Sequence, residues 1–177
     1  MRQLADKERI ERFMGALGAE ASKDVRLYFT GGSTAVLLGW RPSTIDIDIR
    51  FFPELDELFR ALPKLKEELQ VNVELASPPE FIPELAGWQD RSIFITRIGK
   101  ISFYHYDPYS QALAKIERGH SQDRADVERL IESGLVERAK LLAYFEGIEP
   151  ELHRYPAIDP KSFRRSVETV TAPQDDS

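Results

Sequence analysis

The 177 residues of the chain favour one domain, with room for a helical extension. Apolar residues make up 42% of the sequence and charged residues 31%, and no apolar run approaches the length of a membrane span, so we expect no membrane association. The lack of cysteine excludes disulfides and thiolate metal sites. Since no signal peptide is recognisable either, a cytoplasmic protein is predicted. With a net charge of -6, the chain could hold a nucleic acid only through a local basic patch.

Hydrophobic periodicity predicts an α/β (α+β) fold, with strands and helices up to about residue 106 and helices beyond it. Period-2 alternation marks the strands, and apolar residues three and four apart mark the helices. Pro63 is expected to break or kink its helix, and Gly99 to turn a hairpin. The predicted strands are 25–30, 44–51, 69–75, 92–98 and 100–104, and the predicted helices are 5–18, 33–40, 54–69, 108–118, 121–132, 135–146 and 160–170.

Three segments follow from this change of character along the chain. Residues 1–106 are expected to form the sheet domain, and residues 107–170 a helical segment packed on it. The polar end, 171–177, is expected to be a disordered tail.

A glycine turn follows the first long strand. A strand that turns through Gly31 and Gly32 into a helix leaves backbone N–H groups without helical partners, and these groups favour an anion. Glycine also lets a phosphate approach closely, because no Cβ blocks it. Ser33 could add a hydroxyl donor, or it could simply be an N-cap-type residue. Taken alone, the run is more often a turn and a cap than a phosphate site.

Two aspartates lie on the strand predicted next. Asp46 and Asp48 are two residues apart and therefore share one face of that strand, while Ile45, Ile47 and Ile49 share the other face, which should meet the core. Neighbouring carboxylates repel each other unless a proton or a cation intervenes. Mg²⁺ or Mn²⁺, with a substrate phosphate completing its shell, is the functional interpretation. A solvated polar face on an edge strand is the alternative.

A third carboxylate would allow a two-metal arrangement. Glu74 lies on the polar face of the following strand, with Asn72 beside it on the same face. Two metal ions could together bind an α-phosphate, activate an attacking hydroxyl and stabilise the leaving pyrophosphate. Glu74 is the favoured third ligand, although a surface glutamate is nearly as common and Asn72 is the other candidate.

Two stretches carry a family resemblance. FTGGSTAVLLGWRPSTIDIDIRF resembles the signature of the polymerase-beta-like minimal nucleotidyltransferase superfamily, in which Gly-Gly/Ser precedes Asp-x-Asp/Glu by about ten residues. ALAKIERGHSQDRADVERL is similar to the downstream motif of the abortive-infection nucleotidyltransferase toxins of toxin–antitoxin systems. Lys115, Arg118, Asp123 and Asp126 match that motif in order. Unlike the superfamily pattern, the chain offers Glu74 or Asn72 in place of a third aspartate.

The resemblance implies a mixed sheet flanked by helices and followed by a C-terminal helical segment. It implies transfer of a nucleoside monophosphate from an NTP, with Mg²⁺ or Mn²⁺, to an RNA such as tRNA or to a protein side chain. A cognate toxin or antitoxin would be a further partner. The implied metal ligands are Asp46, Asp48 and Glu74, which with Lys115 form the implied catalytic set. The implied nucleotide-binding residues are Gly31, Gly32, Ser33, Lys115, Arg118 and Asp126.

The sequence leaves several readings open. Lys115 and Arg118 would be solvated surface charges without the resemblance, and Asp126 is expected to orient one of them. Near the end of the chain is a basic concentration that could guide RNA or could simply face solvent. It is made of Lys161, Arg164 and Arg165 on the last predicted helix, together with Arg154 before it. A non-catalytic nucleotide-binding or interaction module, such as an antitoxin-like partner, is the second hypothesis, and a polymerase that extends RNA ends is the third. The sequence does not choose the NTP, the acceptor or the oligomeric state.

Overall fold

The computed structural model describes residues 2–174, which fall into two compact units interleaved along the chain. The sheet unit takes the described residues up to Ser77 together with Ser92–Tyr106. The helical unit takes Pro78–Arg91 and the described residues from Asp107 onward. Residues 1–106 are expected from the sequence to form one domain, whereas Pro78–Arg91 groups with the second unit in the structure.

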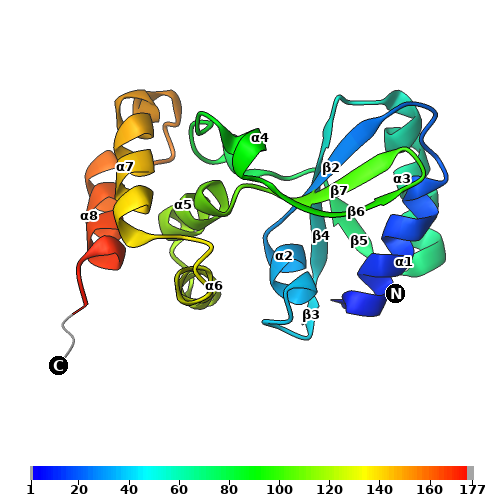
Figure 1. Ribbon diagram of the computed structural model, residues 1–177, viewed down its shortest axis with the longest axis horizontal. Coiled ribbons are helices and arrows are strands. Elements are labelled where there is room, and N and C mark those ends of the chain that lie inside the picture. Colours follow the sequence, from blue (N-terminus) through cyan, green and yellow to red (C-terminus); the bar gives the residue numbers. More distant parts are fainter. Residues whose placement is uncertain (1, 175–177) are drawn as a thin grey trace. The chain divides into compact units, whose positions relative to one another are not determined.

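The sheet unit contains a mixed five-stranded sheet in the order β5-β4-β2-β7-β6 (Figure 1). β2 is antiparallel to β4 and parallel to β7, β4 is parallel to β5, and β6 is antiparallel to β7. A separate two-stranded sheet pairs β1 with β3. The predicted α/β fold class with a mixed sheet is therefore confirmed. The strands are β1 Ala5–Asp6, β2 Val25–Thr30, β3 Ser43–Thr44, β4 Asp46–Phe52, β5 Asn72–Glu74, β6 Ile93–Ile98 and β7 Ile101–His105.

The described residues also form eight α-helices, and none of them is long and apolar enough to cross a bilayer. The helices in the sheet unit are α1 Lys7–Gly18, α2 Gly32–Leu37 and α3 Asp56–Leu69. Those in the helical unit are α4 Trp88–Arg91, α5 Pro108–Arg118, α6 Ser121–Glu132, α7 Arg138–Ile148 and α8 Pro160–Thr171, with short 3₁₀ turns η1 Pro78–Glu80 and η2 Glu149–Arg154. The expected tail began at Thr171, which instead ends α8, and its last residues, 175–177, lie outside the described residues.

The core of the sheet unit lies between one face of the five-stranded sheet and the helices α1 and α3 (Figure 1). Strand alternation sends every second side chain of β2 and β4 into this core, and leaves the residues between them on the opposite face. The main core residues are Ile10, Phe13, Leu17, Leu27, Phe29, Ile47, Ile49, Leu58, Leu62, Leu65 and Phe103. The second face of β4 is therefore available for polar groups.

Three local expectations were wrong. α3 runs without a break through Pro63, because the buried stripe of leucines on either side stabilises the helix despite the lost N–H donor. Ile45 is 72% exposed, since it precedes β4 and has no strand position of its own. Ser33 is not the N-cap of α2. The N-cap is Gly31, and Ser33 is fully buried inside the helix.

In the helical unit, a buried ion pair ties α4 to α5. Asp107, which is 0% exposed, accepts hydrogen bonds from Arg91 Nε at 3.1 Å and Nη2 at 2.9 Å. Its carboxylate also caps α5 by accepting from the backbone N–H groups of Tyr109 and Ser110. The Arg91 guanidinium lies 4.2 Å from the ring centroid of Tyr144 on α7. These contacts explain why the segment ending at Arg91 belongs to the helical unit.

Substitution of Asp107 tests this anchor. Asp107→Ala leaves the half-buried Arg91 guanidinium without its partner and removes a helix cap, so the free energy of unfolding should fall by about 3 kcal/mol. Asp24→Ala is the matched control, because Asp24 pairs with Arg97 at the surface and should contribute little. Urea denaturation measures both, and equal stabilities for the two variants would contradict the anchoring role.

Candidate functional site

The glycine turn and the aspartate strand are brought into direct contact in the sheet unit. Gly31 follows the last residue of β2 and adopts φ +61°, a left-handed conformation that favours glycine. A Cβ on Gly31 would lie 3.0 Å from Asp48 Oδ2, and a Cβ on Gly32 would lie 2.2 Å from Thr44 Oγ1. The turn is therefore pressed against β3 and against Asp48 on β4, and only glycine fits there without displacing them.

Asp46 and Asp48 occupy the face of β4 opposite the core, and both are half-buried. The antiparallel register with β2 sets Asp48 opposite Thr30, the residue before the glycine turn. The parallel register with β5 sets Asp46 beside Asn72 and Asp48 beside Glu74. The structure thus brings the turn, both aspartates and Glu74 to one end of the sheet, on three adjacent strands.

Asn72 connects two of these carboxylates. Its Nδ2 donates to Asp46 Oδ1 at 2.5 Å and to Glu74 Oε1 at 3.2 Å, while its Oδ1 accepts from Arg2 Nη1 at 3.1 Å. Sequence reasoning missed Arg2, because a contact across 70 positions depends on how the sheet assembles and leaves no local pattern. Asn72 acts here as a hydrogen-bond bridge that orients Asp46.

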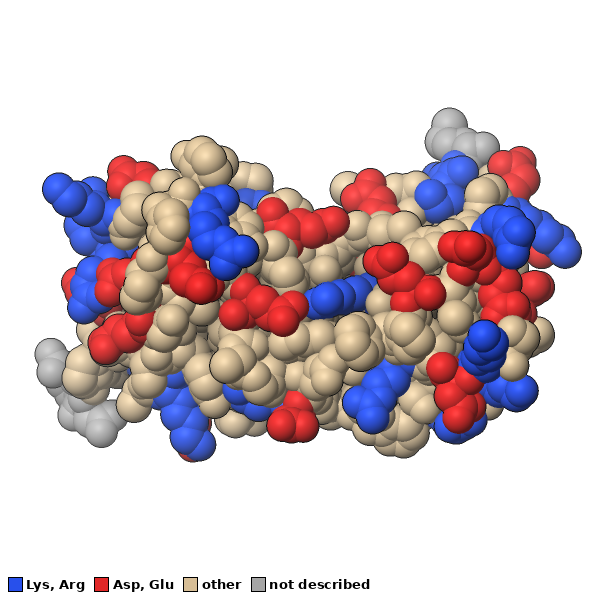
Figure 2. Space-filling model, turned by 90° about the horizontal axis from the view of Figure 1, so that it is seen from above, with Lys and Arg blue, Asp and Glu red and all other residues tan. Residues whose placement is uncertain are grey.

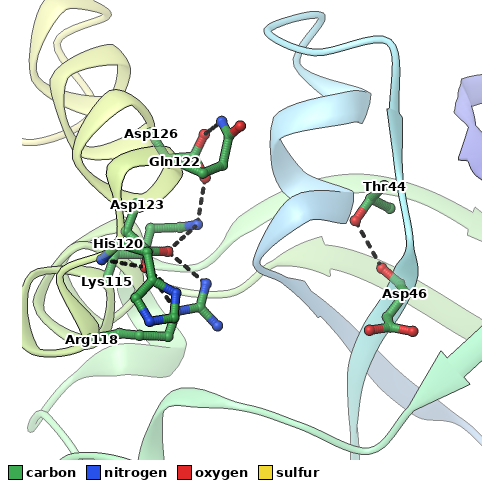
Figure 3. A network of polar contacts seen from close by, with 8 residues as sticks. All are labelled: Thr44, Asp46, Lys115, Arg118, His120, Gln122, Asp123 and Asp126. Carbon is green, nitrogen blue, oxygen red and sulfur yellow. Dashed lines mark hydrogen bonds and ion pairs between the residues drawn. The ribbon is translucent and has the colours of Figure 1, made fainter.

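Two threonines support the same end of the sheet. Thr44 Oγ1 donates to the backbone carbonyl of Asp46 at 3.1 Å (Figure 3). Thr30 Oγ1 donates to the carbonyl of Ala76 at 3.1 Å, which fixes the end of β2 to the chain leaving β5. Neither residue was singled out from the sequence, and the only signal was a hydroxyl residue next to each motif.

The two carboxylates on β4 are suitable ligands for a divalent cation whose coordination shell is completed by a phosphate. Mg²⁺ commonly takes one or two protein carboxylates and completes its octahedron with water and substrate oxygens, which is what Asp46 and Asp48 offer. The Ser33 hydroxyl, fully buried, has no hydrogen-bond partner among the described residues. Over residues 2–174, no three His, Cys, Asp or Glu side chains gather closely enough to hold a metal ion. Glu74 is exposed, and its role as a third ligand stays a prediction.

The downstream motif forms a buried ionic network in the helical unit (Figure 3). Lys115 on α5 is only 7% exposed, so it is not a solvated surface charge. Its Nζ donates to Asp126 Oδ2 at 2.7 Å and lies 4.0 Å from Asp123 Oδ1. Arg118 Nε donates to Asp123 Oδ2 at 2.8 Å. The expected pairing of Asp126 with Lys115 is thus present, and the two helices α5 and α6 are joined by it.

Asp123 also caps α6. Its carboxylate accepts from the backbone N–H of His120 at 3.2 Å, at the first turn of the helix. Burial opposes ionisation of this carboxyl, but the hydrogen bonds and charge of Arg118, the charge of Lys115 and the His120 N–H outweigh it, so the pKa of Asp123 is lowered. Asp123 therefore stays ionised and holds the cations around it.

Tyr104, Tyr106 and Tyr109 pack on other aromatic rings. Tyr104 stacks on Tyr28 with ring centroids 5.3 Å apart, and the fully buried Tyr106 meets Tyr28 edge-on at 5.9 Å. In the helical unit, Tyr109 packs against Tyr144 at 4.8 Å. These contacts have the stacked and edge-on geometries that aromatic side chains adopt when they pack on one another.

His105, the last residue of β7, is buried and its Nδ1 lies 3.1 Å from Thr34 Oγ1. Burial lowers the pKa of His105 from 6.5 to about 4, because the imidazolium would lose its hydration. Neutral imidazole is therefore the form in the folded protein at neutral pH.

The stability of the protein should consequently depend on pH through His105. Between pH 6.5 and about 4 the unfolded chain binds a proton that the folded chain does not, so the free energy of unfolding falls as the pH falls. The loss should reach about 3 kcal/mol at the acid end of the window. Urea denaturation at several pH values should show a shallower dependence for His105→Asn than for the wild type, and parallel curves would contradict the assignment.

Lys115 should stabilise the helical unit through its carboxylate partners. Lys115→Met leaves Asp126 buried beside an apolar chain, so the free energy of unfolding should fall by about 3–5 kcal/mol. Replacing both residues, Lys115→Met with Asp126→Leu, should recover most of that loss. Lys140→Met is the control, because Lys140 pairs with Glu137 at the surface. A double variant no more stable than the single one would contradict the pairing.

Comparison with known proteins agrees with this geometry. A family model described as a nucleotidyltransferase of unknown function (DUF6036) matches residues 9–148, which include the glycine turn, the aspartate strand and the Lys115 network. No curated protein and no solved structure matches the chain. The match covers well over half of the chain and agrees with the resemblance of the first motif to a nucleotidyltransferase superfamily. The chain belongs to this family of nucleotidyltransferases of unknown function.

Proposed function

We propose that the protein transfers a nucleoside monophosphate from an NTP to an acceptor hydroxyl, with Mg²⁺ or Mn²⁺ as cofactor. The observation that carries the proposal is the approach of the Gly31–Gly32 turn to the Asp48 carboxylate. A turn with accessible backbone N–H groups can bind phosphate oxygens, and a carboxylate pair beside it can bind the cation that accompanies them. A glycine turn and a carboxylate pair are each common, but side by side they can bind the phosphates and the metal ion of one metal–triphosphate complex.

The chemistry assigns a role to each group in the sheet unit. The acceptor oxygen forms a bond to the α-phosphorus while the bond from that phosphorus to the bridging oxygen breaks, and pyrophosphate leaves with the electron pair. Gly31, Gly32 and Ser33 hold the β- and γ-phosphates, while Asp46 and Asp48 hold the metal ion, which neutralises phosphate charge. Glu74 is the candidate third ligand or the base that takes the acceptor proton.

The nucleotide-binding roles implied for Lys115, Arg118 and Asp126 belong to the same proposal. An ammonium binds triphosphate oxygens as a point charge, and Asp126 holds the Lys115 ammonium in one position. Arg118 is the more available cation, because its side chain is 59% exposed although it is paired with Asp123.

The charge distribution bears on the acceptor. Arg164 on α8 pairs with Glu149 at 2.7 Å and with Glu168 at 2.8 Å. Arg154 in η2 lies 3.6 Å from Glu151. Acidic and basic side chains are also interspersed on the face drawn in Figure 2. Neutralised arginines contribute less to phosphate contacts, so Arg154 and Arg164 give an RNA acceptor little electrostatic attraction. Transfer to tRNA or to a protein side chain, a cognate toxin or antitoxin, and a cytoplasmic location remain parts of the proposal.

Removal of the carboxylates tests the enzymatic claim. Asp46→Asn and Asp48→Asn should each lower the rate of label transfer from α-labelled NTPs by more than about 100-fold, because each removes metal-binding charge while keeping the size of the side chain. The assay offers total RNA and total protein as acceptors with Mg²⁺ or Mn²⁺. Asp56→Asn, on the exposed first turn of α3, is the control and should transfer normally. Label transfer that is equal in all four proteins would refute the proposed site.

One observation favours a second candidate, a non-catalytic nucleotide-binding module. Glu74 is exposed, and no three-carboxylate group is present in the described part of the chain. Calorimetry with Mg²⁺ and each NTP separates the two. A module should bind nucleotide without turnover and keep that binding in Asp46→Asn with Asp48→Asn, whereas the enzyme should lose metal-dependent binding.

A further inference from the structure

We propose that Thr34 and His105 are positioning residues that hold the Gly31–Ser33 turn in the conformation that binds phosphate. This inference rests on the proposed function, because it takes that turn as the phosphate site. His105 lies outside the two motifs that carry the family resemblance, and Thr34 lies within the first of them, where the resemblance assigns it no role.

A chain of buried hydrogen bonds closes around the turn. Thr34 Oγ1, on α2, donates to the backbone carbonyl of Phe29 at 3.3 Å, and His105 Nδ1, on β7, lies 3.1 Å from the same hydroxyl. The Phe29 carbonyl also accepts from the Tyr106 N–H at 2.8 Å. Phe29 lies two residues before Gly31, and Thr34 lies one residue after Ser33. The contacts therefore join the two ends of the turn to each other and to β7.

The proposal assigns a direction to each of these hydrogen bonds. A hydroxyl has a single proton, and that of Thr34 is donated to the Phe29 carbonyl. In the proposed arrangement the hydroxyl then accepts from His105, whose neutral imidazole carries its proton on Nδ1. Thr34 is 4% exposed and His105 5%, so the contacts lie in a low-dielectric interior that strengthens them.

The hydrogen bonds of Thr34 and His105 can position the turn because its glycines cannot anchor it themselves. Gly31 and Gly32 have no side chains that could anchor the turn, and glycine has the most backbone freedom to lose on binding. Within the turn, the hydrogen bond from the Ala35 N–H to the Gly31 carbonyl is long, at 3.4 Å. Anchors at both ends reduce the conformational entropy that a phosphate would otherwise have to remove, which preorganises the N–H groups. An apolar pair of the same size would fill the space but would not fix the backbone.

Isosteric variants test the inference. Thr34→Val removes the hydroxyl and keeps the shape, whereas Thr34→Ser keeps the hydroxyl. His105→Leu removes the donor, whereas His105→Asn keeps an N–H near the Nδ1 position. Ser102→Ala, a hydroxyl removed elsewhere on β7, is the control. All variants are compared with the wild type by thermal unfolding, so that binding is measured only on folded protein.

Two measurements are then made on each protein. Hydrogen exchange of the Gly31, Gly32 and Ser33 amides reports the turn without any ligand. Calorimetry with Mg²⁺ and each of ATP, GTP, CTP and UTP reports nucleotide binding, and the transfer assay separates KM from kcat. Thr34→Val and His105→Leu should exchange faster at the turn and raise the NTP dissociation constant about tenfold, the scale of one lost hydrogen bond. KM should rise more than kcat falls, and Thr34→Ser, His105→Asn and Ser102→Ala should resemble the wild type.

The outcomes distinguish this inference from the proposed function. Wild-type protein that binds none of the four nucleotides with Mg²⁺ overturns the proposed function, and the positioning role fails with it. Nucleotide binding that is normal in the wild type and unchanged in folded Thr34→Val and His105→Leu overturns the positioning role alone. Turn amides that exchange equally in all the proteins overturn it as well.

Discussion

The close approach of the Gly31–Gly32 turn to the Asp48 carboxylate is the constraint on which the candidate site depends. Space for a Cβ is lacking on both glycines, so the turn can lie against β3 and β4 only because it has no side chains. The antiparallel pairing of β2 with β4 sets Thr30 opposite Asp48, so the turn that follows Thr30 lies beside the Asp48 carboxylate. The position of the proposed nucleotide site at this end of the sheet therefore depends on strand register before it depends on any particular side chain.

The register is in turn fixed by the core. Ile47 and Ile49 are buried against the helices of the sheet unit, which leaves Asp46 and Asp48 on the other face of the same strand. A slip of one residue would bury both carboxylates and expose both isoleucines, at a cost that no hydrogen-bond gain could offset. The hydrophobic effect thus holds the acidic pair in place without contacting it. Asn72 and the two threonines then orient the carboxylate strand through hydrogen bonds.

The sequence predicted the local features well, because they depend on neighbours along the chain. The bounds of α5 and α6 match the expectation, since Asp107, Pro108 and Gly119 are strong start and stop signals. Features set by distant contacts were missed. The Arg2–Asn72 contact, the burial of Lys115 and the grouping of Pro78–Arg91 with the helical unit all depend on which elements meet in space. The prediction for Ile45 was wrong because the alternation of apolar and polar residues begins one residue before β4 does.

The most direct test of the central claim is paramagnetic line broadening by Mn²⁺ in the presence of a non-hydrolysable NTP, observed on the backbone amides. A bound Mn²⁺ at Asp46 and Asp48 should broaden the amides of Gly31–Ser33 and of β4 together, and Asp46→Asn with Asp48→Asn should abolish the effect. Broadening confined to other parts of the chain, or unchanged in the double variant, would contradict a metal–phosphate site formed by the turn and the aspartate strand.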